Sequence, residues 1–188
     1  SYDPDRIDFT LEWALNVTPD GSSAEIEASD QEVVNFEPDL IGLYVAQLTA
    51  TNSIGLQDQC KVVFSAVPSQ GLWIEMHWDM EGDDLDLHLI SPGLDWMSYI
   101  GTGEDCHWSN CAAGGVGLDW GVEGNESDDP HLALDDSTGT GPETMYIEVP
   151  ESGDYTLVIH DYAHGAGYDG TTTVFLKYYL WGVEVLSE

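Results

Sequence analysis

Acidic side chains with the chemistry of hard-cation ligands dominate one stretch of this sequence. In Gly82–Pro92, GDDLDLHLISP, the residues Asp84, Asp86 and His88 alternate with leucines. Successive side chains of a β-strand point to opposite faces. A strand here would therefore place two carboxylates and an imidazole on one face and the leucines in a core. An acidic face in a chain with almost no basic residues suggests a bound cation.

The acids after this stretch extend the same chemistry. Calcium binds roughly six to eight oxygen ligands in flexible geometry, mostly from carboxylates and carbonyls. Loops rich in Asp, Asn and Gly supply such oxygens, and neighbouring aspartates repel one another unless they are solvated or bridged by cations. We expect Ca²⁺ to tie a long loop to the sheet, with ligands drawn from Asp83, Asp84, Asp86, Asp105, Asp119, Asp128, Asp129, Asp135, Asp136 and Asp161.

Two other interpretations of these residues stay open. The acids could form a solvated surface adapted to salty surroundings. Zinc is the rival metal, because His88 lies two positions from Asp86 and further histidines occur at His107, His131 and His160. The chain has no H-x-x-x-H or C-x-x-C pair, which weakens zinc. We expect His88 to orient a carboxylate or to be an ordinary strand residue.

The charge of the chain excludes several classes of partner. Its 188 residues include 36 acids and 3 Lys or Arg, which gives a formal net charge of -33. Such a chain cannot neutralise nucleic-acid phosphates, and anionic membranes disfavour it for the same reason. The chain contains no long apolar run, so direct insertion into a membrane is not expected. Self-repulsion must instead be relieved by solvent, salt or divalent cations.

The cysteines point to an oxidising compartment. Cys106 and Cys111 lie close together in a loop and would form a local disulfide in a secreted or cell-surface protein. Unpaired thiols are the alternative. Cys60 is left over in an expected strand, where a buried free thiol is the simplest interpretation and pairing with a partner chain the minor one.

Short β-prone runs separated by turns predict an all-β chain of two tandem β-sandwich domains, 1–68 and 69–188, with a short linker between them. No helix of normal length is visible. In the first domain the expected strands are Leu11–Val17, Ala24–Ala28, Val33–Phe36, Tyr44–Thr51 and Gln59–Ala66. In the second they are Leu72–Asp79, Asp84–Ile90, Met145–Val149, Tyr155–Tyr162, Thr171–Leu180 and Val183–Leu186. Alternation in the first of these places Leu72, Ile74, Met76 and Trp78 on one face and Trp73, Glu75, His77 and Asp79 on the other.

A motif in the first domain resembles a known family. Phe36, Pro38, Asp39, Gly42 and Tyr44 follow the pattern Phe-x-Pro-Asp-x-x-Gly-x-Tyr. This pattern is similar to that of PKD-type immunoglobulin-like domains, although the Trp-x-Phe-Gly-Asp-Gly stretch of typical members is missing. The resemblance implies a spacer or interaction module without catalytic residues. Independently of the family, we expect Trp13, Phe36, Leu43 and Tyr44 to form the core.

The second domain also resembles a family, through ordered motifs that cover nearly its whole length. These motifs are Asp84–His88, Asp105–Cys111, Asp119–Gly121, Asp128–Pro130, Leu134–Asp136, Gly139–Glu143 and Pro150–Tyr155. They are similar to YfaP-like, DUF2135-type domains of secreted bacterial proteins, especially myxobacterial surface lipoproteins with PKD-like partners. The resemblance implies an extracytoplasmic β-sandwich and no defined activity. The lipobox cysteine of such lipoproteins is missing.

Three tryptophans in the long stretch 91–141 have two interpretations. Trp96, Trp108 and Trp120 could stack on sugar rings as a ligand-contact surface, or they could cover a thin core, which the large area of Trp favours. Catalysis is not expected. Nothing in the sequence marks one carboxyl as lying in the apolar surroundings that would raise its pKa, as a general acid requires. Ser109 does not lie in a nucleophile-elbow motif.

These features predict a non-catalytic, calcium-binding module of a secreted or cell-surface protein. Its expected role is adhesion, glycan contact or extracellular matrix assembly, with an extracellular glycan or protein as partner. One alternative is a structural subunit of an extracellular filament, whose partners would be copies of itself. A second alternative is a lectin-like, carbohydrate-binding domain of a larger enzyme.

Overall fold

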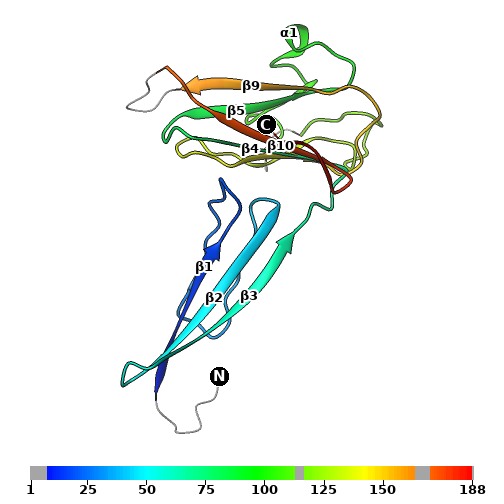
Figure 1. The fold of residues 1–188 in the computed structure, drawn as a ribbon. Helices are drawn as coiled ribbons and strands as arrows, with labels where there is room; N and C mark the ends of the chain where they lie inside the picture. Colours follow the sequence, from blue (N-terminus) through cyan, green and yellow to red (C-terminus); the bar gives the residue numbers. More distant parts are fainter. Residues whose placement is uncertain (1–7, 113–116, 164–169, 188) are drawn as a thin grey trace. The chain divides into compact units, whose positions relative to one another are not determined.

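The computed structural model describes residues 8–112, 117–163 and 170–187. The chain divides into two compact units, Ser1–Val67 and Pro68–Glu188. Both are built from antiparallel β-sheets (Figure 1). Helix in the described residues is confined to the single turn of α1 (Trp96–Tyr99). The predicted all-β class is therefore confirmed.

The first unit contains one three-stranded sheet. β1 (Phe9–Val17), β2 (Gly42–Asn52) and β3 (Gln57–Ala66) lie in the order β1-β2-β3. The predictions of strands at Ala24–Ala28 and Val33–Phe36 were wrong. The segment between β1 and β2 is irregular there, and it packs on the sheet through the ring of Phe36, which contacts the rings of Tyr44 and Phe64.

A partly buried hydrogen-bond network around Asp39 links two parts of this segment to each other and to β2. Its carboxylate accepts from the Ser22 hydroxyl at 2.6 Å and from the Ser23 backbone N–H at 2.6 Å. The Tyr44 hydroxyl donates to it at 2.9 Å and accepts from the Leu40 N–H at 3.0 Å. Tyr44 and Leu40 are buried, whereas Leu43, expected in the core, is 51% exposed because it alternates with Tyr44 along β2.

Asp39→Asn should destabilise the first unit by about 2 kcal/mol, the range for hydrogen bonds to a charged group. Burial raises the pKa of Asp39, but the hydrogen bonds from Ser22, Tyr44 and Ser23 outweigh it and hold the pKa below its ordinary value. Stability from this carboxylate is thus present above the unfolded value of about 4 and is lost as the pH falls further. Hydrogen exchange of β2 amides in the full chain measures both effects. Asp58→Asn, on exposed β3, is the control, and equal losses in the two variants would contradict the prediction.

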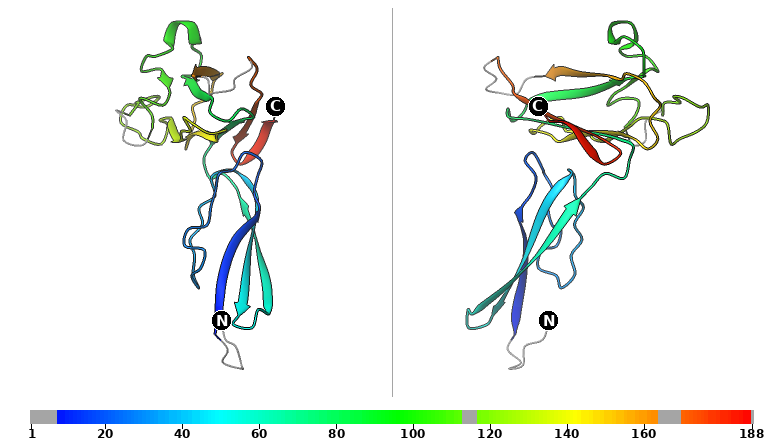
Figure 2. Two further views of the ribbon diagram at one scale, coloured as in Figure 1. Left: turned by 90° about the vertical axis from the view of Figure 1, so that its left-hand side faces the viewer. Right: turned by 45° about the vertical axis from the view of Figure 1, so that its right-hand side comes forward.

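The second unit is a sandwich of two sheets. One sheet has the strand order β11-β10-β4-β8-β7 and the other the order β6-β5-β9; Figure 2 shows them from two further directions. The strands are β4 (Leu72–Trp78), β5 (Asp84–Ile90), β6 (Asp105–Cys106), β7 (His131–Leu134), β8 (Glu143–Ile147), β9 (Thr156–Ala163), β10 (Val174–Leu180) and β11 (Val183–Ser187).

Alternating apolar residues of both sheets form the core. Ile74, Met76 and Trp78 of β4 and Met145 of β8 face Leu87 of β5, and all are almost fully buried. This confirms the predicted faces of β4 and β5. Burial of such side chains contributes about 1.5–3 kcal/mol each, so this core is the main source of stability in the unit.

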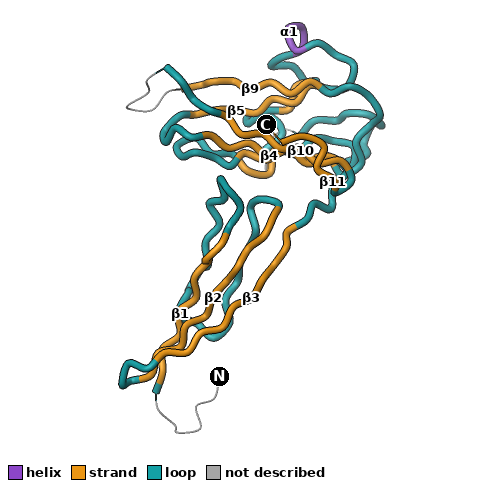
Figure 3. Tube along the Cα trace, viewed as in Figure 1, coloured by secondary structure: helices purple, strands orange, loops and turns teal. Residues whose placement is uncertain are grey.

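Most of the described residues between β5 and β7 lie in loops, which are teal in Figure 3. This segment is held by the disulfide Cys106–Cys111, whose Cα atoms lie 5.4 Å apart and whose cysteines are both buried in the core cluster. The disulfide prediction is confirmed, and it is consistent with an extracellular location. Cys60 is a free thiol on β3, but it is exposed rather than buried. Among the described residues, no helix has the length and apolar character needed to cross a membrane.

Candidate metal site

The polar face of β5 is covered rather than solvated. Asp86 is 5% exposed and His88 is 6% exposed, although both alternate with the core leucines. The side chains that surround them come from β6, β8, β9 and the loop after β7. A buried carboxylate and a buried imidazole require partners, because a polar group without one costs several kcal/mol in a low-dielectric interior, by order of magnitude.

His88 is fixed through one of its two ring nitrogens. Its Nδ1 lies 2.9 and 3.0 Å from the two carboxylate oxygens of Asp105, which is fully buried. A carboxylate only accepts, so Nδ1 carries a hydrogen, and in the neutral imidazole Nε2 then has a free lone pair. Nε2 is buried and has no hydrogen-bond partner. The ring of His107 stacks on that of His88 with centroids 5.1 Å apart, and burial lowers the pKa of His107.

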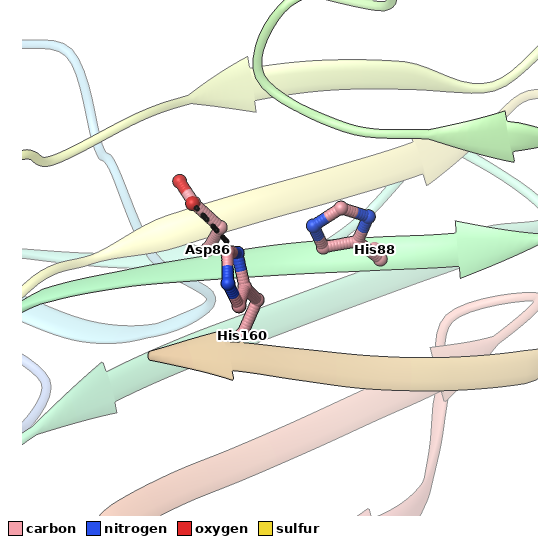
Figure 4. A group of neighbouring side chains, drawn as sticks. All are labelled: Asp86, His88 and His160. Atoms are coloured by element: carbon pink, nitrogen blue, oxygen red, sulfur yellow. Dashed lines mark ion pairs between the residues drawn. The ribbon is translucent and has the colours of Figure 1, made fainter. Parts of the chain in front are cut away.

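His160 faces Asp86 across two paired strands. The antiparallel register of β5 and β9 places these residues directly opposite each other. Nδ1 of His160 lies 3.5 Å from Oδ2 of Asp86, and the two side chains stand beside His88 in Figure 4. Oδ2 of Asp86 makes no hydrogen bond. Potential ligand atoms of Asp86, His88 and His160 lie within 4.8 Å of one another.

A second group, made only of carboxylates, shares Asp86. Oxygens of Asp86, Asp135 and Glu143 also lie within 4.8 Å of one another. Glu143 is 1% exposed; its Oε2 accepts from the Leu87 N–H at 2.7 Å, whereas its Oε1 has no hydrogen-bond partner. β6 pairs only with Leu89 and Ile90 of β5. Glu143 therefore accepts from the Leu87 N–H in place of the backbone carbonyl that a longer neighbouring strand would supply.

Local backbone features bring Asp135 and Glu143 to β5. The register between β7 and β8 shifts between Leu132 and Leu134, and a bulge of this kind redirects the chain just before Asp135. The carboxylate of Asp136 then accepts from the N–H groups of Gly139 and Gly141, each at 2.9 Å. Gly141 has φ +88°, and a Cβ there would lie 3.0 Å from the His77 Cα, so glycine is required in the turn that leads to Glu143.

The carboxylates of this group repel one another, and the burial of Asp86 and Glu143 adds to the cost of ionising these two. Burial, reinforced by Asp135 and Asp86, raises the pKa of Glu143 to about 9 despite the hydrogen bond from Leu87. Burial and the neighbouring Asp84 raise the pKa of Asp86, and burial and Asp135 raise that of Asp84. A divalent cation among these oxygens would favour the charged forms and remove the repulsion.

Most of the other predicted ligands instead hold backbone or side-chain donors. Asp119, Asp128, Asp129 and Asp136 accept from backbone amides in their own loops. Asp83 accepts from the Thr172 hydroxyl. Asp105 orients His88, and Asp161 lies one residue beyond His160 on β9. Of the ten predicted residues, the structure brings Asp86 and Asp135 into a three-carboxylate group with Glu143, and Asp84 lies close enough to raise the pKa of Asp86.

The tryptophans separate into two kinds. Trp120 is 5% exposed in the core cluster, where its Nε1 donates to the Gly103 carbonyl at 2.8 Å. It cannot form part of a ligand-contact surface. Trp96 and Trp108 are 44% and 48% exposed and remain available for such a surface.

Glu143 was left out of the ligands predicted from the sequence altogether, and His88 and His160 were considered only for the rival zinc interpretation. Glu143 ends the GTGPE motif, which offered a local signal, and His88 lies on the acidic strand itself. His160 gave no local signal, since its place opposite Asp86 depends on the pairing of β5 with β9.

Comparisons of the chain with protein-family models, with curated proteins and with solved structures find no match. The interpretation of the site therefore depends on its geometry and chemistry.

Proposed function

We propose that the second unit is a calcium-binding structural module of a secreted or cell-surface protein. The observation that carries this proposal is the convergence of Asp86, Asp135 and Glu143 from β5, the end of β7 and β8. Two of these carboxylates are more than nine-tenths buried, and each has an oxygen without a hydrogen-bond partner. An ion in this position would join the two sheets at the edge of β5.

The chemistry of this group suits calcium. All three groups supply hard oxygen donors from separate chain segments, and Ca²⁺ accepts such irregular sets, completed by carbonyls and water. Only the folded chain holds these oxygens together. Bound calcium would therefore stabilise the fold by about 2.7 kcal/mol at a concentration roughly a hundredfold above Kd.

The burial of the site favours a non-catalytic role. Glu143 has the raised pKa of a general acid, but at 1% exposure it cannot reach a substrate. We propose instead that the ion stiffens the unit for adhesion or matrix assembly, and that exposed Trp96 and Trp108 contribute to contact with a glycan or protein partner. The buried disulfide supports an oxidising, extracellular setting.

Calcium should raise the melting temperature of the EDTA-treated protein by roughly 10 °C at saturation, from the stabilisation above and the size of the unit. Magnesium should act more weakly because it demands near-octahedral geometry and dehydrates reluctantly. Tryptophan fluorescence follows this unit well, since every tryptophan except Trp13 lies in it.

Asp135→Asn should remove most of the calcium response, whereas Asp154→Asn, an equal change of charge in an exposed turn, should retain it. If NaCl of matched ionic strength produced the same shift as calcium, or if both variants responded alike, screening of a general acidic surface would replace the proposed site.

A further inference from the structure

We propose a second metal site in the same unit, in which Asp86, His88 and His160 bind a d-block divalent cation such as Zn²⁺. This site differs from the calcium site in two of its three ligands. It does not depend on calcium binding, because its argument starts from the imidazoles and not from the acids.

His88 is already prepared as a ligand. Asp105 holds Nδ1, and the opposite nitrogen, Nε2, is buried and unpartnered. A histidine that binds zinc ordinarily donates its other ring N–H to a carboxylate or carbonyl, which fixes the tautomer and orients the lone pair toward the metal. A purely structural His88 would leave Nε2 desolvated with nothing in return.

Asp86 and His160 lie where the remaining ligands are needed. They face each other across β5 and β9, and their facing atoms are 3.5 Å apart. Two ligands bound to one Zn²⁺ at about 2.0–2.1 Å lie at most about 4.2 Å apart. One potential ligand atom of each residue lies within 4.8 Å of the others, so a small movement of side chains would bring them to that separation, and the His160 side chain is 49% exposed.

The ligand types select the metal. Imidazole nitrogen suits Zn²⁺, Cu²⁺ and Ni²⁺, whereas calcium and magnesium prefer sets made only of oxygen. Three protein ligands leave one tetrahedral position for water at the exposed side of His160. Asp86 has two oxygens, so one carboxylate can contribute to both metal sites.

The test uses the full chain after removal of metals with EDTA. Co²⁺, a spectroscopic substitute for Zn²⁺, should produce visible d–d absorption, and Zn²⁺ titrated by calorimetry should bind and abolish that absorption. His160→Asn should weaken Zn²⁺ binding by at least about tenfold, the loss expected when a coordinating set is impaired. His160 is exposed on β9, so this variant should fold, which far-UV circular dichroism checks.

His131→Asn is the matched control, since His131 stacks on Tyr146 and belongs to neither ligand group. It should bind Zn²⁺ as the unmodified chain does. Equal affinities of the two histidine variants, or no Co²⁺ absorption from the unmodified chain, would overturn the proposal. The calcium proposal and the zinc proposal can be tested separately. His160→Asn should keep the rise in melting temperature with calcium, and Asp135→Asn should keep Zn²⁺ binding.

Discussion

Glu143→Gln should stabilise the cation-free protein and at the same time remove most of its response to calcium. In EDTA, the amide no longer places an ionisable group beside Asp86 and Asp135, while its carbonyl still accepts from the Leu87 N–H. The expected gain in unfolding free energy at neutral pH is about 2 kcal/mol. With calcium, the variant lacks a ligand charge and should be less stable than the unmodified chain.

The pH dependence of this gain has a definite sign. The folded pKa of Glu143 is about 9, above the ordinary 4.5, so the folded state keeps a proton that the unfolded chain releases. The stability contributed by the protonated carboxyl is fully present below about pH 4.5 and is lost as the pH rises toward 9. The advantage of Glu143→Gln in EDTA should therefore be absent near pH 4 and grow with pH.

Chemical denaturation in EDTA and in calcium, at several pH values, measures both effects. Glu148→Gln is the control, because it makes the same change at an exposed position just after β8. Its effects should be small in both solutions. If Glu143→Gln destabilised the EDTA-treated protein and left the calcium shift intact, Glu143 would be only a structural acceptor for β5.

Asp105→Asn should cost about 2–3 kcal/mol of stability and weaken Zn²⁺ binding roughly ten- to a hundredfold. Asp105 is fully buried and accepts from His88 Nδ1 with both oxygens and from the Gly101 N–H at 2.6 Å. An amide oxygen at the position of Oδ2 could still accept from both partners, but the NH₂ group in place of Oδ1 would face the His88 Nδ1–H, and the negative charge that strengthens both hydrogen bonds would be lost. Either the amide N–H groups and the His88 Nδ1–H oppose each other, or His88 changes tautomer and its Nε2 carries a hydrogen in place of the lone pair that a metal needs.

Thermal melts and Zn²⁺ calorimetry separate these consequences. Asp119→Asn is the control, since exposed Asp119 accepts one backbone amide, from Gly124, and asparagine can still do so. It should change stability by less than about 0.5 kcal/mol. An Asp105→Asn protein with full Zn²⁺ affinity would show that Asp105 does not position His88.

Local patterns in the sequence predicted much of the fold. The alternation in 72–78 and 84–90 predicted both strands and both faces correctly, because a period of two is a property of neighbouring residues. Cys106 and Cys111 were paired correctly from their closeness and composition. The strands predicted at 24–28 and 33–36 were wrong because side-chain contacts of Asp39 and Tyr44 with Ser23 and Leu40, and not strand pairing, hold this irregular segment.

Acid content alone was a poor guide to which carboxylates converge. Asp128, Asp129 and Asp136 have the residue type of calcium ligands, yet each accepts from a backbone N–H in its own loop. The short side chain of aspartate forms such local contacts readily, so residue type cannot separate a loop organiser from a metal ligand.

By itself, the sequence determined the all-β class, the core faces of β4 and β5, the disulfide and the acidic strand at the centre of the site. Only the tertiary structure decided that His160 faces Asp86, that Glu143 reaches the edge of β5, and that the polar face of β5 is buried. Alternation depends only on adjacent residues and can therefore be recognised in the sequence. Strand register and the burial of a face depend on packing between segments far apart in the chain.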